Sequence, residues 1–386
     1  MSRKLRMGMV GGGPGGFIGN IHRKAAMLTG EIELACGAFS SRREKSGEMG
    51  RQLYLEPSRV YDSYVQMIEH EAVLPIPERM DFVSIVTPNY LHYPVAKYAL
   101  EKGFPVICDK PLTIRYEESR ELAAVAEAKS LPFAVTYVYS GYPMVKEART
   151  RVLRGDLGKI RKVIATYTQG GLSKLLKAEK QKKPLWRLDP VKGGKAGSIG
   201  DIGTHAEHIV RYITGLAINE VYADLHITIA GRKIFDDGDI LVHLDNGANG
   251  VISLSQVASG EKNNLAVAVY GERGSLEWKQ QEPNSLVLKW GDRPSEQLKT
   301  GLNSPAVESD TLAATILPAG HPEGFIEAFS NIYRGFVCTV RRGLLKEHVN
   351  CSVPDYPEIN DGVAGMAFIE AALQSTEAKK WIKVKA

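Results

Sequence analysis

An apolar strand that runs directly into a glycine-rich loop is the feature that most constrains how this chain folds. Residues 5–10 are a short apolar run, and Gly11-Gly12-Gly13-Pro14-Gly15-Gly16 follows before a helical stretch that starts near Gly19. Glycines at such a junction allow a tight turn and a close approach of the backbone to a pyrophosphate, which the N–H groups of the following helix bind. The loop therefore predicts dinucleotide binding, with a purely structural glycine turn as the alternative.

The spacing within this loop has two interpretations. A strict Gly-x-Gly-x-x-Gly pattern places its third glycine at Gly16, whereas a loop with residues 14–17 inserted places it at Gly19. The candidate cofactor-binding residues of this segment are Gly11, Gly13, Gly16, Phe17 and Ile18.

Short apolar runs alternate with helical stretches over the first 137 residues. Strands are expected at residues 5–10, 32–39, 82–86, 105–108 and 132–135, and helices near 19–28, 61–69, 93–101 and 116–129. Such alternation is typical of strand-helix-strand units around a parallel sheet. We therefore predict an α/β fold whose first domain, residues 1–137, is a doubly wound Rossmann sheet.

After residue 137 the apolar runs follow one another with short connections. Strands are expected at residues 160–167, 221–229, 239–244, 248–256 and 264–270, with hairpin turns at Asp245-Asn246-Gly247 and Gly271-Glu272-Arg273-Gly274. Helices are expected at residues 144–154, 321–345 and 360–379. A length of 386 residues fits two domains, so we predict that residues 138–386 form an α+β substrate-binding and oligomerisation domain with a mostly antiparallel open sheet.

Composition and charge exclude several classes of function. The net charge is +5, from 49 Lys and Arg against 44 Asp and Glu, and no run of five basic residues occurs, which disfavours nucleic acid as a partner. The 4 cysteines form no Cys-x-x-Cys pair, so their spacing predicts neither a disulfide framework nor a zinc ribbon, and a reducing cytoplasm fits best. No signal peptide or membrane span is expected, because no long uninterrupted apolar run occurs.

The second predicted strand ends without an acidic residue. An Asp or Glu there normally binds the ribose hydroxyls of NAD, whereas this strand continues Ala38-Phe39-Ser40-Ser41-Arg42-Arg43. Ser40 and Ser41 together with Arg42 could accept the 2′-phosphate of NADP, and the two serines could equally serve the hydroxyls of NAD. The arginines could instead open a solvated helix. Both dinucleotides therefore stay open, with Ser40, Ser41 and Arg42 as candidate contacts.

Two polar motifs follow the third and fourth predicted strands. The first is Thr87-Pro88-Asn89-Tyr90-Leu91-His92 and the second is Cys108-Asp109-Lys110-Pro111. Ligands bind at the carboxyl ends of the strands in open α/β sheets, and Lys110 could donate a hydrogen bond to a substrate oxygen there. The candidate cofactor-binding residues of these motifs are Thr87, Pro88, Asn89, His92, Asp109 and Lys110, with a scaffold role as the alternative for His92.

A third motif, Gly200-Asp201-Ile202-Gly203-Thr204-His205, opens a helix in the second half of the chain. Asp201 and His205 are four residues apart, so in a helix they share a face, and a carboxylate can orient an imidazole for proton transfer. The alternative is that Asp201 caps the helix and that His205 is a buried histidine without a chemical role.

Other side chains are weaker candidates for substrate binding. Tyr139 follows the last strand of the first domain, Trp186 and Arg187 lie on a long irregular connection, and His321 precedes a predicted helix. Packing, capping or surface roles are the alternatives. No metal site is expected, because His205 and His208 have ligand spacing but no third ligand is evident.

These motifs occur in a characteristic order: the glycine loop, Thr-Pro-Asn-x-x-His, an acid-Lys-Pro triplet, and Gly-Asp-x-Gly-x-His. Together they resemble the Gfo/Idh/MocA oxidoreductase family, named after glucose-fructose oxidoreductase and inositol dehydrogenase, over nearly the whole chain. The resemblance implies that His205 takes a hydroxyl proton, Lys110 polarises the reacting oxygen and Asp201 orients His205 while hydride passes to nicotinamide. Two features depart from the family pattern: Asp109 replaces the usual Glu, and the glycine loop is longer than most.

The resemblance implies an NAD(P)-dependent dehydrogenase that acts on a secondary hydroxyl of a sugar, anhydrosugar, glycoside or cyclitol. The long glycine loop and the motifs after it are similar to the branch that contains levoglucosan dehydrogenase, which implies oxidation of a pyranose 3-hydroxyl. Two alternatives stay open: an enzyme that couples oxidation to elimination or hydrolysis of glycosides with a recycled cofactor, and a non-catalytic NAD(P)-binding sensor. The family also implies a homodimer or homotetramer.

Overall fold

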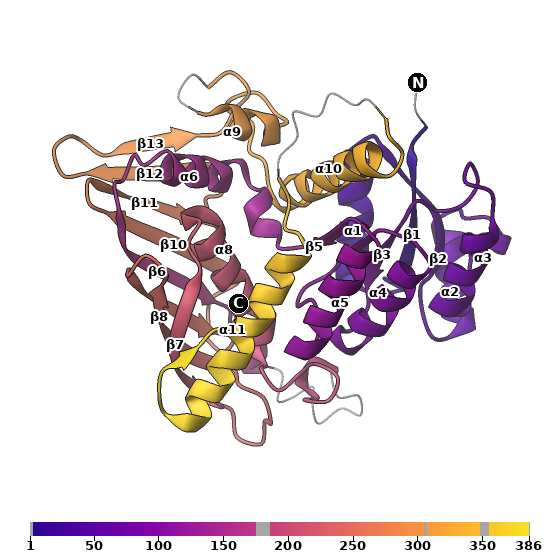
Figure 1. Cartoon of the computed structure of the whole chain (residues 1–386), viewed down its shortest axis with the longest axis horizontal. Coiled ribbons are helices and arrows are strands. Elements are labelled where there is room, and N and C mark those ends of the chain that lie inside the picture. Colours follow the sequence, from indigo (N-terminus) through magenta and orange to yellow (C-terminus); the bar gives the residue numbers. More distant parts are fainter. Residues whose placement is uncertain (1–2, 175–185, 305–306, 348–354, 386) are drawn as a thin grey trace. The chain divides into compact units, whose positions relative to one another are not determined.

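The computed structural model describes residues 3–174, 186–304, 307–347 and 355–385 (Figure 1). The chain divides into two compact units, neither of which is continuous in sequence. The first unit comprises Met1–Thr113, Glu117–Val138 and Phe325–Val363, and the second comprises Ile114–Tyr116, Tyr139–Gly324 and Ala364–Ala386. The chain therefore returns to the first unit after residue 324, a return that the expected boundary at residue 137 does not include.

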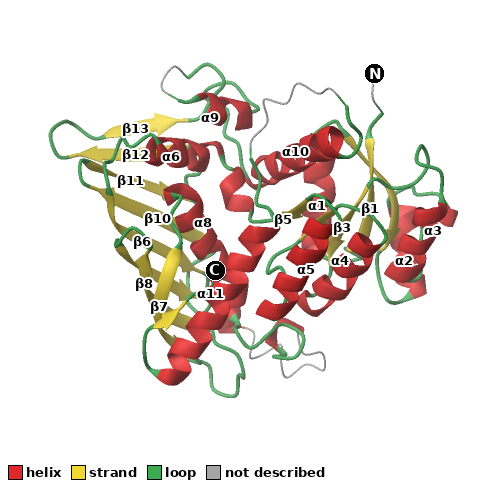
Figure 2. Cartoon of the chain, in the orientation of Figure 1, coloured by secondary structure: helices red, strands yellow, loops and turns green. Residues whose placement is uncertain are grey.

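The first unit is built on a five-stranded parallel sheet with the order β2-β1-β3-β4-β5 (Figure 2). Its strands are β1 (Leu5–Gly11), β2 (Ile32–Ala38), β3 (Phe82–Val86), β4 (Val106–Cys108) and β5 (Phe133–Val135). Its helices are α1 (Phe17–Leu28), α2 (Arg43–Gln52), α3 (Tyr64–Val73), α4 (His92–Glu101), α5 (Tyr116–Ala128) and α10 (Phe325–Gly343), with short turns η1 (Pro57–Arg59) and η2 (Asn89–Leu91). Every residue of β3 is buried, as expected for a central parallel strand. The predicted Rossmann sheet is confirmed.

The start of α3 is fixed by a local hydrogen bond. α3 starts after Ser63, not at residue 61 as expected, because the Ser63 hydroxyl accepts a hydrogen bond from Gln66 N and caps the helix. Tyr61 instead donates its backbone N–H to the oxygen of Gly37 in β2. α2 begins at Arg43, so a helix does start at this point, which is compatible with either role of the arginines.

A buried polar cluster joins α1, β3 and α10. The Nδ1 atom of His22 lies 2.8 Å from the phenolic oxygen of Tyr333, and Ser84 Oγ lies 3.1 Å from the same oxygen. Because the imidazole is fully buried, the pKa of His22 falls to about 4. Burial also raises the pKa of Tyr333.

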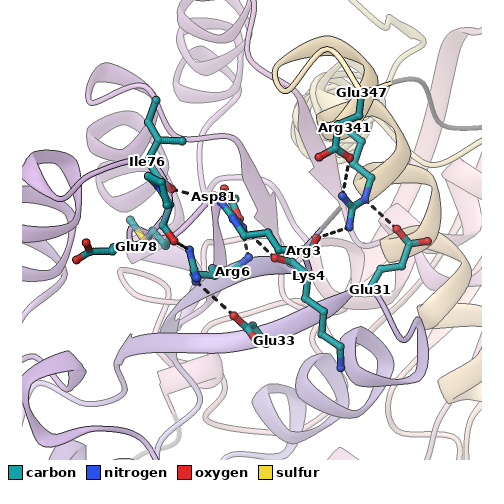
Figure 3. A network of polar contacts seen from close by, with 12 residues as sticks. Arg3, Lys4, Arg6, Glu31, Glu33, Ile76, Glu78, Asp81, Arg341 and Glu347 are labelled. Atoms are coloured by element: carbon teal, nitrogen blue, oxygen red, sulfur yellow. Dashed lines mark hydrogen bonds and ion pairs between the residues drawn. The ribbon is translucent and has the colours of Figure 1, made fainter. Parts of the chain in front are cut away.

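Hydrogen bonds from charged side chains join α10 to the residues before β1 and β2, at the amino-terminal end of the parallel sheet (Figure 3). The guanidinium group of Arg341, near the end of α10, donates to Glu31, Glu347 and the backbone oxygen of Arg3 over 2.9, 2.7 and 3.0 Å. Arg3 in turn donates to both carboxylate oxygens of Asp81, over 2.6 and 2.8 Å. Arg341 is only 4% exposed, so its charge depends on these partners.

The second unit is built on a nine-stranded sheet with the order β13-β12-β11-β10-β6-β9-β8-β7-β14. Its strands are β6 (Ile160–Thr168), β7 (Ile218–His226), β8 (Asp237–Leu244), β9 (Asn249–Ser255), β10 (Asn264–Gly271), β11 (Gly274–Lys279), β12 (Ser285–Trp290), β13 (Glu296–Lys299) and β14 (Ile382–Lys383). β6 and β9 pair in parallel, and the other described neighbours are antiparallel. The predicted mostly antiparallel sheet and both hairpins are confirmed.

Helices α6 and α8 pack on this nine-stranded sheet (Figure 2). The helical segments outside the first unit are η3 (Val138–Gly141), α6 (Pro143–Leu153), η4 (Gly171–Lys174), η5 (Trp186–Leu188), η6 (Ile199–Gly203), α8 (Thr204–Thr214), α9 (Ser309–Ala314) and most of α11 (Ile359–Ala378). β12, β13, β14 and α9 were not expected from the sequence, because each is short or carries little apolar periodicity.

Two expected elements of this half of the chain have other limits than predicted, because buried carboxylates accept hydrogen bonds from the backbone there. β7 stops at His226 rather than residue 229, since Asp236 accepts hydrogen bonds from the N–H groups of Thr228 and Ile229. The helix expected from residue 321 begins only at Phe325. The preceding turn is held by Glu323, whose carboxylate accepts from two backbone N–H groups at residues 316 and 317.

The cysteines differ in part from expectation. Cys36 and Cys108 are buried free thiols, whereas Cys338 is disulfide-bonded. The spacing of the cysteines gave no sign of this bond, because spacing in the sequence does not report which cysteines the fold brings together. Cys351 lies outside the described residues.

Candidate active site

The glycine loop packs closely against the elements that it joins. Gly11 (φ +90°) lies so near to β3 that a Cβ atom there would be 2.7 Å from the Val86 oxygen. A Cβ atom on Gly19, in α1, would be 2.4 Å from the Gly12 Cα atom, whereas one on Gly16 would meet its nearest neighbour at 3.1 Å. The closest approach of helix and loop therefore falls at Gly19, the position of the third glycine in the longer register.

The start of α1 presents backbone donors. Gly16 is the residue before the helix and has no side chain with which to cap the first turn, so the N–H groups that open α1 suit an anionic ligand. Phe17, the first helical residue, is 72% exposed, and Ile18 is half-buried. On the other side of the loop, a Cβ atom on Gly13 would be 2.8 Å from the Phe39 oxygen. This cradle suits a pyrophosphate.

Arg23 supports the loop from one turn further along α1. Its Nη1 atom donates to the Gly12 oxygen over 3.1 Å, and its side chain is 8% exposed. Sequence reasoning missed Arg23, because a basic residue on a short helix is usually solvated. Its position four residues after Gly19, on the same face of the helix, was the available signal.

The ends of β2 and β3 supply further groups that fit a dinucleotide. Thr87 Oγ1, directly after β3, is buried and has no hydrogen-bond partner among the described residues. After β2, Ser40 Oγ accepts a hydrogen bond from Arg42 N over 3.2 Å, and Ser41 and Arg42 are exposed. Together with the glycine cradle, these residues fit the phosphates and the adenosine ribose of NAD or NADP.

His92 links the two motifs at the carboxyl ends of β3 and β4. Its Nδ1 atom lies 2.8 Å from the Pro111 oxygen, and its Nε2 atom lies 3.0 Å from the Thr87 oxygen. The ring is fully buried, and burial lowers the pKa of His92. The imidazole lies between backbone oxygens of the two loops, and its neutral form donates its single N–H to one of them.

Lys110 is held by its neighbours in the chain. The Oδ1 atom of Asp109 accepts hydrogen bonds from Lys110 N and from Thr136 Oγ1, both over 2.9 Å. The Lys110–Pro111 peptide bond is cis, and Lys110 is half-buried. The backbone thus fixes Lys110 at the carboxyl end of β4, and Pro88 and Asn89 lie half-buried after neighbouring β3.

Asp201 lies inside the π-helical turn η6, which leads directly into α8. The predicted helix is therefore present, but Asp201 is within its first turn rather than at its cap. The Oδ2 atom of Asp201 accepts a hydrogen bond from Gln256 Nε2 over 2.7 Å. A Cβ atom on Gly203 would be 2.8 Å from a methyl carbon of Leu254, so glycine lets this turn pack on β9. Turns of this kind are rare and frequently occur at functional sites.

His205, in the first turn of α8, packs against aromatic side chains of the second unit. The ring of Tyr139 packs edge-on against the imidazole, with 4.9 Å between centroids, and the Tyr167 ring lies at 6.2 Å. His205 is 5% exposed and Tyr139 is 2% exposed. The structure therefore brings two sequence-predicted residues, His205 and Tyr139, into direct contact.

A closed ring of hydrogen bonds fixes this aromatic pair. Tyr167 donates to Asn263 Oδ1 over 2.7 Å, and Asn263 Nδ2 donates to Tyr139 over 3.0 Å. Since Tyr167 uses its only proton on Asn263, Tyr139 is the donor in the 2.6 Å contact between the two phenolic oxygens. Burial raises the pKa of both tyrosines, and the nearby charge of Asp201 adds to the effect. Asp201 therefore acts on the same cluster.

The residues predicted to bind substrate come from both units of the chain. Trp186 lies in η5 and is half-buried, while the side chain of Arg187 lies outside what the structure describes. His321 is exposed in the turn before α10. Lys110 belongs to the first unit, whereas Asp201, His205, Tyr139 and His321 belong to the second.

The described part of the chain has neither a cluster of metal ligands nor a membrane-spanning helix. It contains no group of three or more His, Cys, Asp or Glu side chains placed to hold a metal ion. No helix within those residues is both long and apolar enough to cross a membrane.

Two family models match this chain, one in each half. Residues 5–137 match the oxidoreductase family described as an NAD-binding Rossmann fold, and residues 145–277 match the GFO/IDH/MocA C-terminal domain. The first match contains the glycine loop and Lys110, and the second contains Asp201 and His205.

Individual relatives give the same assignment. An uncharacterized oxidoreductase of Bacillus subtilis, YfiI, is 32% identical over 100% of this chain and 98% of its own length. An inositol dehydrogenase homolog from Azotobacter vinelandii, crystallised with NAD+, is 32% identical and has a TM-score of 0.92, with 99% of this chain and 98% of that chain covered. Levoglucosan dehydrogenase of Pseudarthrobacter phenanthrenivorans is more distant, at 25% identity over 79% of this chain and 81% of its own. This chain belongs to the Gfo/Idh/MocA family of oxidoreductases and carries its NAD-binding Rossmann fold.

Proposed function

We propose that this chain is an NAD(P)-dependent dehydrogenase that oxidises a secondary hydroxyl of a cyclitol, sugar, anhydrosugar or glycoside. The observation that carries the proposal is the set of Lys110, Asp201 and His205, each held by buried or half-buried neighbours. Removal of hydride from an alcohol needs a base for the hydroxyl proton and a donor for its oxygen, which are the chemistries of His205 and Lys110. A sensor that only binds a nucleotide has no use for this set.

Each residue of the set has one proposed role. His205 takes the hydroxyl proton, and a nicotinamide cofactor, when bound, would supply the hydride acceptor. Lys110 donates a hydrogen bond to the reacting oxygen, and its backbone is kept in position by Asp109 and His92. Asp201 orients His205 and favours its protonated form once the proton has moved.

The cofactor is proposed to be NAD, with use of NADP as well. NAD is supported by relatives crystallised with NAD+ or NADH. NADP is supported by the chain itself, because Ser40, Ser41 and Arg42 follow β2 where an acid would repel a 2′-phosphate.

A cyclitol is the substrate class that the relatives favour. The Azotobacter vinelandii homolog, 31% identical with a TM-score of 0.90, was crystallised with NADH and myo-inositol. Levoglucosan dehydrogenase is a more distant relative, so levoglucosan is the second candidate. We also propose Tyr139 as a residue of the substrate pocket, because its ring packs against His205. Substrate contacts by Trp186, Arg187 and His321 stay predictions.

We also propose a homodimer or homotetramer that forms through the face of the nine-stranded sheet opposite α6 and α8. Side chains alternate between buried and more exposed along β8, and Leu241 on that strand is 45% exposed. Trp381, next to the edge strand β14, is 37% exposed. Light scattering after gel filtration, on wild type and Leu241→Lys, tests this proposal. A monomeric wild type would contradict it.

The experiment that tests the enzyme follows absorbance at 340 nm with NAD and NADP separately, across myo-inositol, levoglucosan, glucosides and free sugars. A rise that depends on substrate and is lost in Lys110→Ala and His205→Asn supports the proposal. Mass spectrometry of the products runs in parallel. Product without NADH would instead indicate a recycled cofactor, and tight dinucleotide binding without product from any compound would indicate a sensor.

A further inference from the structure

A chain of neutral side chains runs away from Asp201 at one end of the nine-stranded sheet. Gln256 follows β9, Gln169 follows β6, and Asn263 precedes β10, three strands that are neighbours in the order β10-β6-β9. The parallel pairing of β6 with β9 aligns Thr168 with Ser255, so the two glutamines that follow them lie side by side. The sheet topology therefore assembles this group from residues far apart in sequence.

The hydrogen bonds of this group have one consistent direction. Gln256 Nε2 donates to Asp201 Oδ2 over 2.7 Å and to Gln169 Oε1 over 3.3 Å. Gln169 Nε2 then donates to Asn263 Oδ1 over 2.5 Å, and Asn263 belongs to the ring that fixes Tyr139. If the Gln256 amide were turned over, its oxygen would face two other acceptor oxygens. The arrangement therefore admits one orientation of this amide.

Gln256 is itself firmly held. Its side chain is 6% exposed, its backbone N–H donates to the Asp236 oxygen over 2.9 Å, and its backbone oxygen accepts from Leu172 N over 3.1 Å. Asp236 is fully buried and is paired with Arg232. A donor with so little freedom can fix the carboxylate that it contacts.

We infer that Gln256 is a positioning residue that sets the orientation of Asp201 for catalysis. The inference rests on the proposed function for the part that concerns catalysis. A neutral amide satisfies one carboxylate oxygen and adds no counter-charge, so Asp201 keeps its negative charge for the imidazole. The same amide connects Asp201, through Gln169 and Asn263, to the hydroxyl of Tyr139, whose ring packs on His205. Asp201 and Tyr139 are therefore held by one hydrogen-bond network.

Two substitutions at position 256 test this inference. Gln256→Leu removes the donor, and kcat is expected to fall about 10- to 100-fold because the carboxylate is misplaced. The KM for NAD is expected to stay within about 3-fold, since Gln256 lies in the second unit and the glycine loop in the first. The matched control is Gln374→Leu, because Gln374 on α11 also donates to a carboxylate, that of Glu370, but is exposed.

Gln256→Glu provides a signature that a merely structural role would not produce. A carboxylate beside Asp201 is repelled, whereas a protonated carboxyl group donates to Asp201 as the amide does. The ratio of kcat/KM in Gln256→Glu to that in wild type is therefore expected to rise as the pH falls from about 8 to 6. A ratio that does not depend on pH would contradict the inference.

Crystal structures of wild type and Gln256→Leu separate this inference from the proposed function, because they need no turnover. Asp201 is expected to change rotamer, or to occupy two conformers, in the variant. An unchanged Asp201 overturns the positioning role even if the enzyme is active. If wild type turns over none of the compounds while Asp201 moves in the variant, the proposed function fails and the positioning of Asp201 stands. Should Gln256→Leu not fold, the structure and pH series of Gln256→Glu decide.

Discussion

Tyr139 donates its phenolic proton to Tyr167 across 2.6 Å, and the direction of this hydrogen bond is set by Asn263, which takes the proton of Tyr167. The pair connects η3, at the start of the second unit, with β6 in its sheet. Because the Tyr139 ring also packs on His205, the pair determines the surroundings of the proposed base.

Removal of the Tyr167 hydroxyl should break the ring of hydrogen bonds that joins Tyr139, Tyr167 and Asn263. We expect Tyr167→Phe to lower the free energy of unfolding by about 1–2 kcal/mol, because Tyr139 loses its acceptor in a buried place. Urea denaturation measures the change. Tyr54→Phe is the matched control, since Tyr54 is 96% exposed. Equal free energies of unfolding for the two variants would show that this ring of hydrogen bonds does not stabilise the fold.

Acid should weaken the fold through His22. The pKa of His22 is lowered to about 4 by burial, from 6.5 in the unfolded chain, so the unfolded state binds more protons between these values. The contribution of neutral His22 to the free energy of unfolding is thus fully present above about pH 6.5 and is lost as the pH falls toward 4. Urea denaturation at pH 6.5 and 5 is expected to differ by about 2 kcal/mol from this group.

The control for that measurement is a variant without the buried imidazole. His22→Gln should have a smaller drop in stability between pH 6.5 and 5, whereas His321→Gln, at an exposed position, should keep the wild-type drop. His92 contributes in the same direction, because burial also lowers its pKa, so part of the drop remains in every variant. An identical drop in His22→Gln and wild type would rule out His22 as a source.

Gly19 should be essential for dinucleotide binding. In Gly19→Ala the new methyl group would lie 2.4 Å from the Gly12 Cα atom, which forces the loop away from the helix. We expect the affinity for NAD to fall at least about tenfold in a fluorescence titration. Gly47→Ala in α2, where the nearest atom would be 3.6 Å away, is the matched helical control and should bind NAD as wild type does. Similar affinities in both variants would place the pyrophosphate elsewhere.

Arg42 should distinguish the two dinucleotides. Arg42→Glu places a carboxylate at the end of β2, which repels a 2′-phosphate and can accept hydrogen bonds from ribose hydroxyls. The ratio of kcat/KM with NADP to that with NAD is expected to fall about tenfold or more, as measured by the absorbance assay. Glu44→Gln, on the neighbouring exposed turn, should change this ratio little. An unchanged ratio in Arg42→Glu would mean that this segment does not contact the 2′ position.

The contacts of Arg341 should contribute to stability rather than to activity. Arg341→Met leaves Glu31, Glu347 and the Arg3 oxygen without their shared donor, and we expect a loss of about 2 kcal/mol in urea denaturation. Arg120→Met, at an exposed position of α5, is the control. A loss of kcat without a loss of stability would contradict this assignment.

Most of the first unit could be predicted from sequence because its signals are local. The strand, glycine loop and helix from Leu5 to Leu28 form from neighbouring residues, and their alternation with later strands identifies the parallel sheet. The same holds for Lys110, whose motif follows a short apolar strand. The return of α10 was not predicted, since a helix pattern does not show which unit the helix completes.

The site in the second unit was only half visible in the sequence. Asp201 and His205 share one motif, but Gln169, Gln256 and Asn263 sit at the ends of separate strands without a common pattern. Their meeting depends on the parallel pairing of β6 with β9, whereas the short connections predicted antiparallel neighbours. Such a contact depends on strand order, which local patterns do not fix.

The return of residues 325–363 to the first unit has a consequence for how the protein is made. α10 supplies Tyr333 to the cluster around His22 and Arg341 to the network beside β1, so the Rossmann sheet lacks part of its packing until those residues emerge from the ribosome. During synthesis from the amino terminus, strands β6 to β13 of the nine-stranded sheet are therefore made before α10, the last helix of the nucleotide-binding unit. Only β14 of that sheet is made after α10. The nucleotide-binding unit therefore begins first and receives its last helix only after most of the second unit has been synthesised.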